Sequence, residues 1–254
     1  MKSIYNRISE IEKSNKSAAL CTIINTSGST PRKTGTKMIV YEDGSIFGTV
    51  GGGSLEKKVI NNAIEIIKNK TPQIFKYVLT QKEGMGCGGT NEIFIEPITG
   101  TSKLIIFGAG HIGKTLAKFA KEVNFSVTLI DDRQEIFDGF DTSGFQIIQK
   151  KYNDAFEELF FDNNTYITSI MREHSFDRDI IAYCAKQPHA FLGMIGSKAK
   201  IATAKKIFLS ENLLTEEQMS NINWPMGIDI KCNTPEEIAV SILAKLIDVR
   251  SKLN

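Results

Sequence analysis

The chain has 254 residues, of which 41% are hydrophobic and 24% are charged, and its formal net charge is +2 at pH 7. This length allows one large domain or two small ones with a substantial core, whereas the small charge excludes the strongly basic footprint of a nucleic-acid partner. No apolar run approaches the roughly 18 residues of a membrane span, and the four cysteines and three histidines lack the spacing of a structural zinc site. Because the start of the chain lacks the apolar core of a signal peptide, we expect a cytoplasmic protein with free thiols and no membrane partner.

The first hundred residues read as short strands separated by turns, with one helix among them. Turn-forming residues around Gly28 and Gly44 divide the segments, and the turn at Gly44 predicts a hairpin. The predicted strands are 18–24, 37–41, 46–50, 75–79 and 92–97, and the predicted helix is 55–69. We therefore expect residues 1–100 to form a smaller α+β domain with a mostly antiparallel or mixed sheet.

A strand, a glycine loop and the start of the predicted helix meet at Gly51, Gly52, Gly53 and Ser54. Backbone N–H groups at a helix start attract anions, so this loop predicts an anion cradle. Ser54 is the expected N-cap, Glu56 suits the positive end of the helix, and the basic loop 31–37 could supply counter-charge. A tight structural turn beside an exposed basic loop is the alternative interpretation.

Cys87 lies in the run Gly84-Met85-Gly86-Cys87-Gly88-Gly89. Glycines on both sides leave its thiol uncovered, among backbone N–H groups that favour the thiolate. Such a thiolate could bind a soft metal, carry sulfur or attack an electrophile, and an incidental loop cysteine is the alternative. Cys21 and Cys184 fall in apolar patterns and are expected in the core, whereas the pattern around Cys232 leaves its role open.

From residue 101 onward the pattern changes to strands that alternate with helices. The predicted strands are 104–107, 127–130, 145–148, 166–170 and 191–195, and the predicted helices are 111–123, 177–186 and 198–211. A last helix begins with Thr234 as N-cap, Pro235 at the first helical position and Glu237 completing a capping box. This alternation predicts a C-terminal α/β domain, residues 101–254, with a Rossmann-like, doubly wound parallel sheet.

The strand 104–107 leads into Gly108-x-Gly110-x-x-Gly113 and then a helix, which is the context of a dinucleotide-binding turn. Gly108 makes the turn, Gly110 admits a pyrophosphate and Gly113 allows close packing of helix on strand. The next strand ends in Asp131, Asp132 and Arg133. A carboxylate there suits a ribose 2′-hydroxyl and favours NAD over NADP, a preference that the arginine weakens. A Rossmann scaffold with an unused cleft is the alternative.

Two more segments follow strands of the same predicted sheet and should border the same cleft, because ligands bind outside the carboxyl ends of such strands. The first contains His174, and the second contains Gly196, Ser197 and Lys198. Gly196 can admit a ligand, Ser197 can cap the next helix and Lys198 can face an anion. A hydrogen-bonded loop histidine and a solvated first helical turn are the alternatives for His174 and Lys198.

In their order along the chain, these motifs resemble one known family nearly end to end. The matching segments are 28–32, 48–56, 84–89, 107–113, 131–133, His174 with Asp177, 195–198, 225–230 and 234–239. They are similar to those of the XdhC/CoxI family, the accessory or maturation proteins of xanthine dehydrogenase and related molybdenum hydroxylases. Two segments depart from the family pattern. Met171-Arg172-Glu173-His174 stands where the family usually has Thr-Arg-Gly-His. After the Gly-x-Asp-Ile stretch this chain has Lys231-Cys232-Asn233, where the family usually has alanine or an acidic residue.

The resemblance implies a chaperone rather than a catalyst. It implies binding of molybdenum cofactor (molybdopterin or its dinucleotide form), support of its sulfuration, and delivery to a xanthine dehydrogenase-type hydroxylase, with a cysteine desulfurase as a further partner. The residues expected to contact a cofactor are Gly51, Gly52, Gly53, Ser54, Cys87, Gly88, Gly108, Gly110, His111, Ile112, Gly113, Asp131, Asp132, Arg133, His174, Gly196, Ser197 and Lys198. Cys87 is the expected soft contact to the metal.

We therefore expect a two-domain protein, as a homodimer, that binds this cofactor in a cleft bordered by all three glycine-rich groups. Two other interpretations stay open. An NAD-dependent oxidoreductase would need a catalytic set beside the nicotinamide, and none is evident in the sequence. A dinucleotide-sensing regulatory protein would use the Rossmann-like domain but has no evident need for Cys87.

Overall fold

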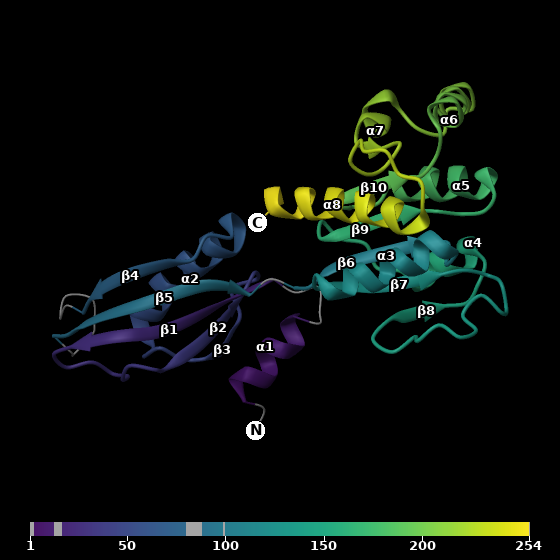
Figure 1. The fold of residues 1–254 in the computed structure, drawn as a ribbon. Coiled ribbons are helices and arrows are strands. Elements are labelled where there is room, and N and C mark those ends of the chain that lie inside the picture. The colour runs from purple at the N-terminus through teal and green to yellow at the C-terminus, as the bar shows by residue number, and fades with distance from the viewer. Residues whose placement is uncertain (1–2, 13–16, 80–87, 99, 254) are drawn as a thin grey trace. The chain divides into compact units, whose positions relative to one another are not determined.

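The computed structural model describes residues 3–12, 17–79, 88–98 and 100–253. The chain divides into two compact units, Met1–Gly100 and Thr101–Asn254, each with its own sheet and core (Figure 1). Among the described residues, no helix combines the length and the apolar character that a membrane crossing requires.

The first unit is a five-stranded antiparallel sheet in the order β3-β2-β1-β5-β4. Its elements are α1 (Ile4–Glu12), β1 (Ala18–Ser27), β2 (Lys37–Tyr41), β3 (Ile46–Gly48), α2 (Gly53–Asn69), β4 (Gln73–Val78) and β5 (Thr90–Ile98). The predicted α+β class and the hairpin at Gly44 are confirmed, and the sheet is antiparallel throughout.

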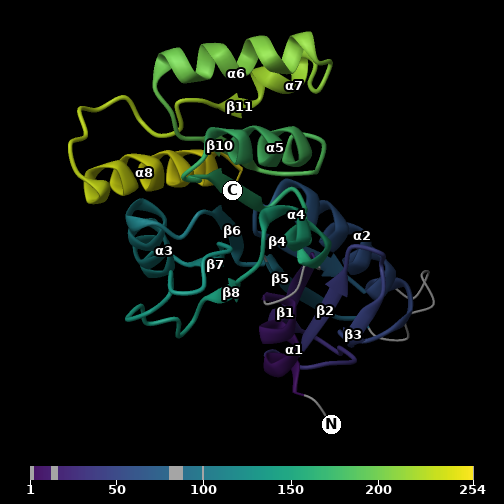
Figure 2. The same cartoon turned by 90° about the vertical axis from the view of Figure 1, so that its right-hand side faces the viewer.

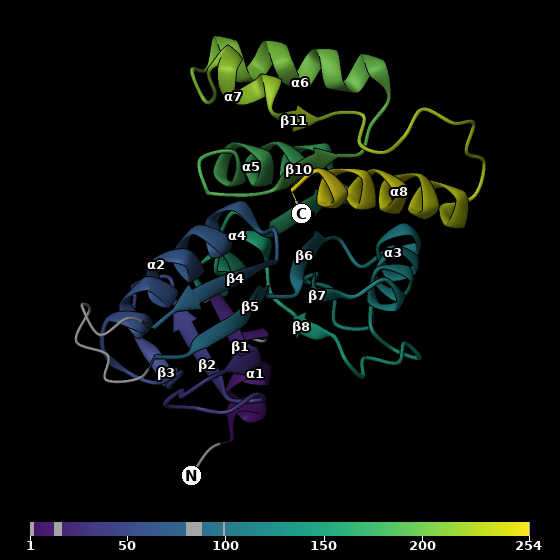
Figure 3. The ribbon, with the colours of Figure 1, turned by 90° about the vertical axis from the view of Figure 1, so that its left-hand side faces the viewer.

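Alternation along the strands gives this sheet two apolar faces, and one helix covers each. Helix α2 packs one apolar stripe, including Leu55 and Val59, against inward residues such as Cys21 and Ile93. Helix α1, which the sequence analysis did not predict, packs Ile11 against the opposite face. The two helices lie on opposite sides of the strands (Figure 3).

The second unit is a six-stranded parallel sheet in the order β11-β10-β9-β6-β7-β8. Its strands are β6 (Ser102–Phe107), β7 (Phe125–Ile130), β8 (Gln146–Ile148), β9 (Thr165–Ser169), β10 (Phe191–Met194) and β11 (Ile222–Asn223). Its helices are α3 (His111–Glu122), α4 (Tyr152–Ala155), the 3-10 turn η2 (Phe156–Glu158), α5 (His174–Cys184), α6 (Lys198–Ser210), α7 (Glu216–Ser220) and α8 (Pro235–Leu253). Numbered from β6, this is the Rossmann order 3-2-1-4-5-6, so the predicted fold is confirmed.

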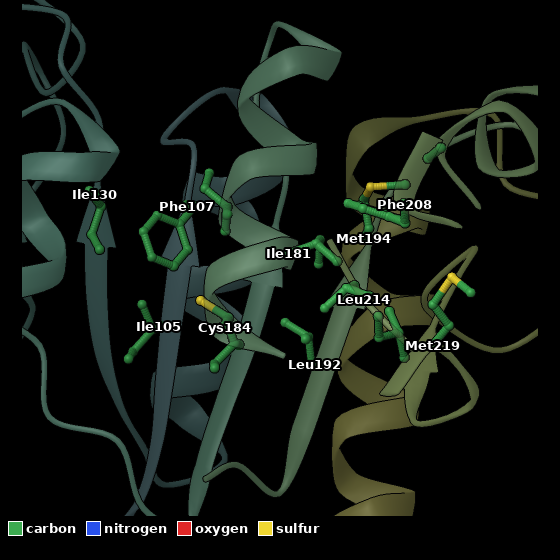
Figure 4. Packing of buried hydrophobic residues seen from close by; sticks show 14 of the residues in the cluster. Ile105, Phe107, Ile130, Ile181, Cys184, Leu192, Met194, Phe208, Leu214 and Met219 are labelled. Carbon is green, nitrogen blue, oxygen red and sulfur yellow. The ribbon is translucent and has the colours of Figure 1, made fainter. Parts of the chain in front are cut away.

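Helices cover both faces of the parallel sheet, which explains why its strands are almost continuously apolar. Helices α3 and α8 bury Leu116 and Ile242 on one face, and α4 and α5 lie on the other face (Figure 2). On that second face, Ile181 and Cys184 of α5 cover strand residues such as Phe107 (Figure 4). Because β6, β9 and β10 run parallel, the loops that follow them lie at the same edge of the sheet.

Candidate functional site

The first candidate site lies where the chain reverses its winding in the parallel sheet. Strands β6 and β9 are neighbours, but the helices that follow them, α3 and α5, cover opposite faces. Their loops therefore diverge at the carboxyl ends of the strands, the usual ligand position in such sheets. The Ile170 N–H donates to Phe107 O (2.8 Å), and the Gly108 N–H donates to Ile130 O (2.8 Å), which fixes both loops to the sheet.

The three glycines of the first loop differ in what surrounds them. Gly108 has a φ of 104°, and a Cβ there would overlap with Ile170 O; a Cβ on Gly113 would overlap with Gly108 O. These two glycines are therefore required by the backbone itself. Gly110 instead borders open space, since a Cβ added to it would have no neighbour within 4 Å, so a ligand can approach its backbone.

The start of α3 has the properties of an anion site. Gly110 is its N-cap and provides no side-chain hydrogen bond, and the first turn carries no acidic residue. His111 is exposed and Ile112 is half-buried at the first two helical positions. The positive end of the helix dipole is therefore not neutralised by a neighbouring acidic side chain of the first turn, which suits a phosphate or pyrophosphate.

Asp131, at the end of β7, holds this loop in place. Its carboxylate accepts hydrogen bonds from the Ala109 N–H (2.8 Å), from Arg133 Nε and Nη2 (2.8 Å each) and from the Arg133 N–H (3.2 Å). Burial raises the pKa of Asp131, but the hydrogen bonds from Arg133 and Ala109 outweigh burial, so its pKa lies below the ordinary value. Because Asp131 is 3% exposed and engaged within the protein, a ribose contact would fall to the half-buried Asp132.

The loop after β9 is held in the same manner. The buried Asp177 accepts hydrogen bonds from Ser169 Oγ (2.6 Å) and from the Met171 N–H (3.0 Å). His174 is the first residue of α5, and its side chain lies outside the described part of the structure. Two buried carboxylates thus fix the loops after β6 and β9.

The third predicted segment follows β10, the neighbour of β9. Ser197 is the N-cap of α6 and accepts from the Lys200 N–H (3.4 Å), as predicted. A Cβ on Gly196 would have no neighbour closer than 3.6 Å, and Lys198 is exposed. This segment therefore lies at the same edge of the sheet as the other two loops.

In the first unit, three glycine-containing loops meet at one place. A Cβ on Gly28 would lie 3.1 Å from Gly89 Cα, and a Cβ on Gly51 would lie 2.6 Å from Pro31 Cγ. The loops 28–31, 51–53 and 88–89 are therefore in direct contact, and we call this place the unit-1 loop cluster. Gly88 is exposed, whereas Cys87 lies outside the described residues.

The glycine loop before α2 already contains a carboxylate. Glu56 Oε2 accepts hydrogen bonds from Thr49 Oγ1 (2.6 Å) and from the N–H groups of Val50 (3.3 Å) and Gly52 (3.1 Å). The N-cap is Gly52 rather than Ser54, so the predicted capping role of Ser54 is wrong, because the helix starts one residue before it. A ligand anion at this loop would have to compete with Glu56, and the predicted cradle stays a prediction.

Asn91, two residues after Gly89 on β5, is a polar group that the sequence analysis missed. It is fully buried, and neither its Nδ2 nor its Oδ1 has a hydrogen-bond partner among the described residues. Such orphaned groups are rare in proteins and commonly mark a missing polar partner. The alternation of β5 places Asn91 on the inward face with Ile93 and Ile95, but no sequence signal shows that its carboxamide lacks a partner among the described residues.

The described residues contain no group of three or more His, Cys, Asp or Glu side chains that could hold a metal ion. Cys21 and Cys184 are buried, as predicted, and burial raises the pKa of Cys21 to about 12 and that of Cys184 as well. These two thiols are therefore structural, and the predicted metal contact at Cys87 stays a prediction.

Comparison with known proteins places the chain in a family. Residues 104–246 match the model of the XdhC Rossmann domain, and residues 12–78 match the model of the XdhC and CoxI family. The chain belongs to this family. Both matches fall on the units described above, one in each.

Two curated relatives and one solved structure are similar to the chain. The uncharacterized protein YqeB of Escherichia coli K12 is 29% identical over 254 residues, which cover 98% of this chain and 46% of the relative. A probable xanthine dehydrogenase subunit from Bacillus subtilis 168 is 29% identical over 169 residues, or 65% and 48% of the two chains. The chain thus spans about half the length of these relatives.

The solved structure is a xanthine dehydrogenase from Bacillus halodurans, with a TM-score of 0.52 and 20% identity. The similarity covers 100% of this chain and 97% of that chain. It supports the fold of the XdhC and CoxI family member described here.

Proposed function

We propose that this protein is an accessory factor of a xanthine dehydrogenase-type molybdenum hydroxylase that binds molybdenum cofactor and supports its sulfuration and insertion. Membership of the XdhC and CoxI family supports the accessory role. The observation that carries cofactor binding is the unit-1 loop cluster, where three glycine-containing loops meet close in sequence to the orphaned carboxamide of Asn91. Gly88, the residue after Cys87, is part of that cluster.

The residues of the two candidate sites fit the chemistry of this cofactor. A pterin presents donors and acceptors on one edge, and the Asn91 carboxamide can both donate and accept. The start of α3 beside Gly110 suits the phosphate or, in the dinucleotide form, the pyrophosphate. Cys87 is the proposed soft contact to the metal, and a cysteine desulfurase is the proposed source of the sulfur. When bound, the cofactor would supply the molybdenum centre that the partner hydroxylase needs.

Replacing Asn91 by leucine separates binding from folding. Removing both unpaired polar atoms for a side chain of similar shape is neutral or stabilising, so the melting temperature of Asn91→Leu should be unchanged or higher. Its pterin content, measured by fluorescence after oxidation of protein purified from a cofactor-producing host, should fall. Asn61→Leu, at an exposed position of α2, is the matched control and should keep its pterin.

Cys87 is tested by its effect on the partner. Cys87→Ser should lower the activity of a co-expressed hydroxylase without changing the fold of this chain, whereas Cys232→Ser should leave that activity unchanged. If the wild-type protein carries no pterin and binds none on addition, cofactor binding is wrong. Full hydroxylase activity with Cys87→Ser would remove the thiol from the proposal.

The Rossmann unit supports a second candidate function, binding of NAD by an NAD-dependent oxidoreductase or a dinucleotide-sensing protein. The specific observation is the loop at Gly108–Gly113 with its uncapped helix start in a sheet of Rossmann order. Titration with NADH, followed by nicotinamide fluorescence, tests binding. Formation of NADH with a substrate would favour the enzyme, and binding without turnover or pterin would favour the sensor.

A further inference from the structure

The second unit contains a pocket beside the loops after β9 and β10, and its lining includes no residue of the glycine loop 108–113. Its volume is about 370 Å³, and it lies between α5 and α6 at the carboxyl end of β10. Met194 and Ile195 form the strand side, and Ala204 and Ile207 form the side of α6. This volume lies near the lower end of the range for small-molecule sites, about 300–1,000 Å³, so the pocket suits a ligand the size of a mononucleotide.

The walls of this pocket favour a flat, apolar ring system. Ala199 and Ala204 are small, which leaves room for a ring to lie against the helix. Met194 offers a polarizable thioether, which makes favourable contacts with aromatic rings. Arg178 also lines the pocket, and its planar guanidinium can stack on such rings as well as bind anions.

The pocket lining carries two cations, Arg178 and Lys200, and one carboxylate, Asp177, so its net charge is positive. Arg178 is half-buried, Lys200 is exposed, and within the described parts of the chain neither has an ion-pair partner. The nearest carboxylates in sequence are occupied: Asp177 accepts from Ser169 and Met171, and Asp179 accepts from Tyr152 Oη (2.6 Å). A half-buried arginine without a carboxylate is an expected feature of an anion site.

We propose that this pocket binds a planar heteroaromatic anion, with its fused rings between α5 and α6 and its phosphate or carboxylate on Arg178 and Lys200. A nucleotide base with its phosphate and a pterin with an acidic group share this chemistry. The inference does not depend on the proposed function, because it uses neither the unit-1 loop cluster nor the loop at Gly110.

The test is a calorimetric titration of the full chain with two pairs of probes. Adenosine monophosphate is compared with adenosine, and pterin-6-carboxylate is compared with pterin. At least one anion should bind about tenfold more tightly than its neutral partner, as expected for a charge-assisted contact. The more tightly bound pair identifies the ring system.

Variants then locate the bound probe. Arg178→Ala should weaken the anion about tenfold, and Thr203→Phe, which fills the pocket from an exposed position of α6, should abolish binding. Lys206→Ala removes a charge from α6 outside the pocket and should have no effect. Circular dichroism and melting temperature check that each variant is folded.

Two outcomes overturn the proposal. One is that neither anion binds the wild-type chain more tightly than its neutral partner. The other is that binding survives Thr203→Phe but is lost with Gly110→Asp, which places the ligand at the glycine loop. Failure of the proposed function is recognised separately, by the pterin content of the wild-type protein.

Discussion

At the scale of single residues, two buried carboxylates hold the loops after β6 and β9 in the second unit. Asp131 binds the backbone of the loop after β6, and Asp177 binds that of the loop after β9. Both side chains accept from N–H groups that would otherwise have no partner at a strand end. The carboxylates therefore act as supports beneath the loops, and the surface above them is left to backbone groups and to Asp132.

Asp131→Asn should destabilise the second unit by about 1–3 kcal/mol, because a neutral amide replaces the charged acceptor of Arg133 and one of its atoms cannot accept. Urea unfolding at pH 7 measures this difference. Asp132→Asn, one residue along and without such contacts among the described residues, is the control and should cost less than about 0.5 kcal/mol. Equal effects of the two variants would contradict the supporting role of Asp131.

The ion pair of Asp131 and Arg133 predicts that the free energy of unfolding depends on pH. The pKa of Asp131 is lower in the folded state than its usual value of about 3.9, so the stabilisation is complete above about pH 4 and is lost as the pH falls through the folded-state pKa. The difference in unfolding free energy between wild type and Asp131→Asn should be constant from pH 7 to about pH 5 and should shrink below about pH 4. A difference that grows on acidification has the opposite sign and would exclude this linkage.

At the scale of helices and strands, local pattern predicted most elements, and the missed ones have physical reasons. Strand β11 has only two residues and α7 only five, too short for a periodic signal. Helix α1 has only nine residues, so its short apolar stripe of Ile4, Ile8 and Ile11 is stabilised by packing on the sheet rather than by intrinsic preference. Ser54 was expected to cap α2, but the helix begins at Gly53 and its N-cap is Gly52.

The site residues were predictable only where the backbone alone dictates them. Gly108 and Gly113 follow from the sterics of a strand-to-helix turn, and the structure agrees. Asp131 follows a strand end, where a carboxylate can point to a ligand or to its own loop, and only the tertiary contacts decide between them. The pocket between α5 and α6, and the lack of a partner for the Asn91 carboxamide among the described residues, arise from packing of distant segments, which no local pattern records.

The start of α8 gives a prediction at this scale. Thr234 Oγ1 accepts from the Glu237 N–H (3.2 Å), and the Glu237 carboxylate accepts from the Thr234 N–H (3.2 Å), which confirms the predicted capping box. Thr234→Ala should cost about 1 kcal/mol, as measured by chemical unfolding. Thr142→Ala, in an exposed loop, should change stability by less than about 0.5 kcal/mol. A cost no larger than that of the control would show that the box does not stabilise α8.

At the scale of the whole molecule, the chain consists of two separately built units. Each of its core clusters draws its residues from one unit alone, and each family match lies within one unit. A cleft bordered by all three glycine-rich groups stays a prediction.

Separate cores predict that damage to one unit is confined to it. Leu116 is fully buried on α3, and Leu116→Ala should lower the stability of the second unit by about 2–5 kcal/mol. Amides of β6 and β7 should then exchange with deuterium faster, because core strands exchange through opening of their own cooperative unit, while amides of β1 and β5 keep their protection. Val59→Ala, on α2 of the first unit, should produce the reverse pattern. Mass spectrometry of peptic fragments measures both, and equal loss of protection in the two units with either variant would mean that they unfold as one.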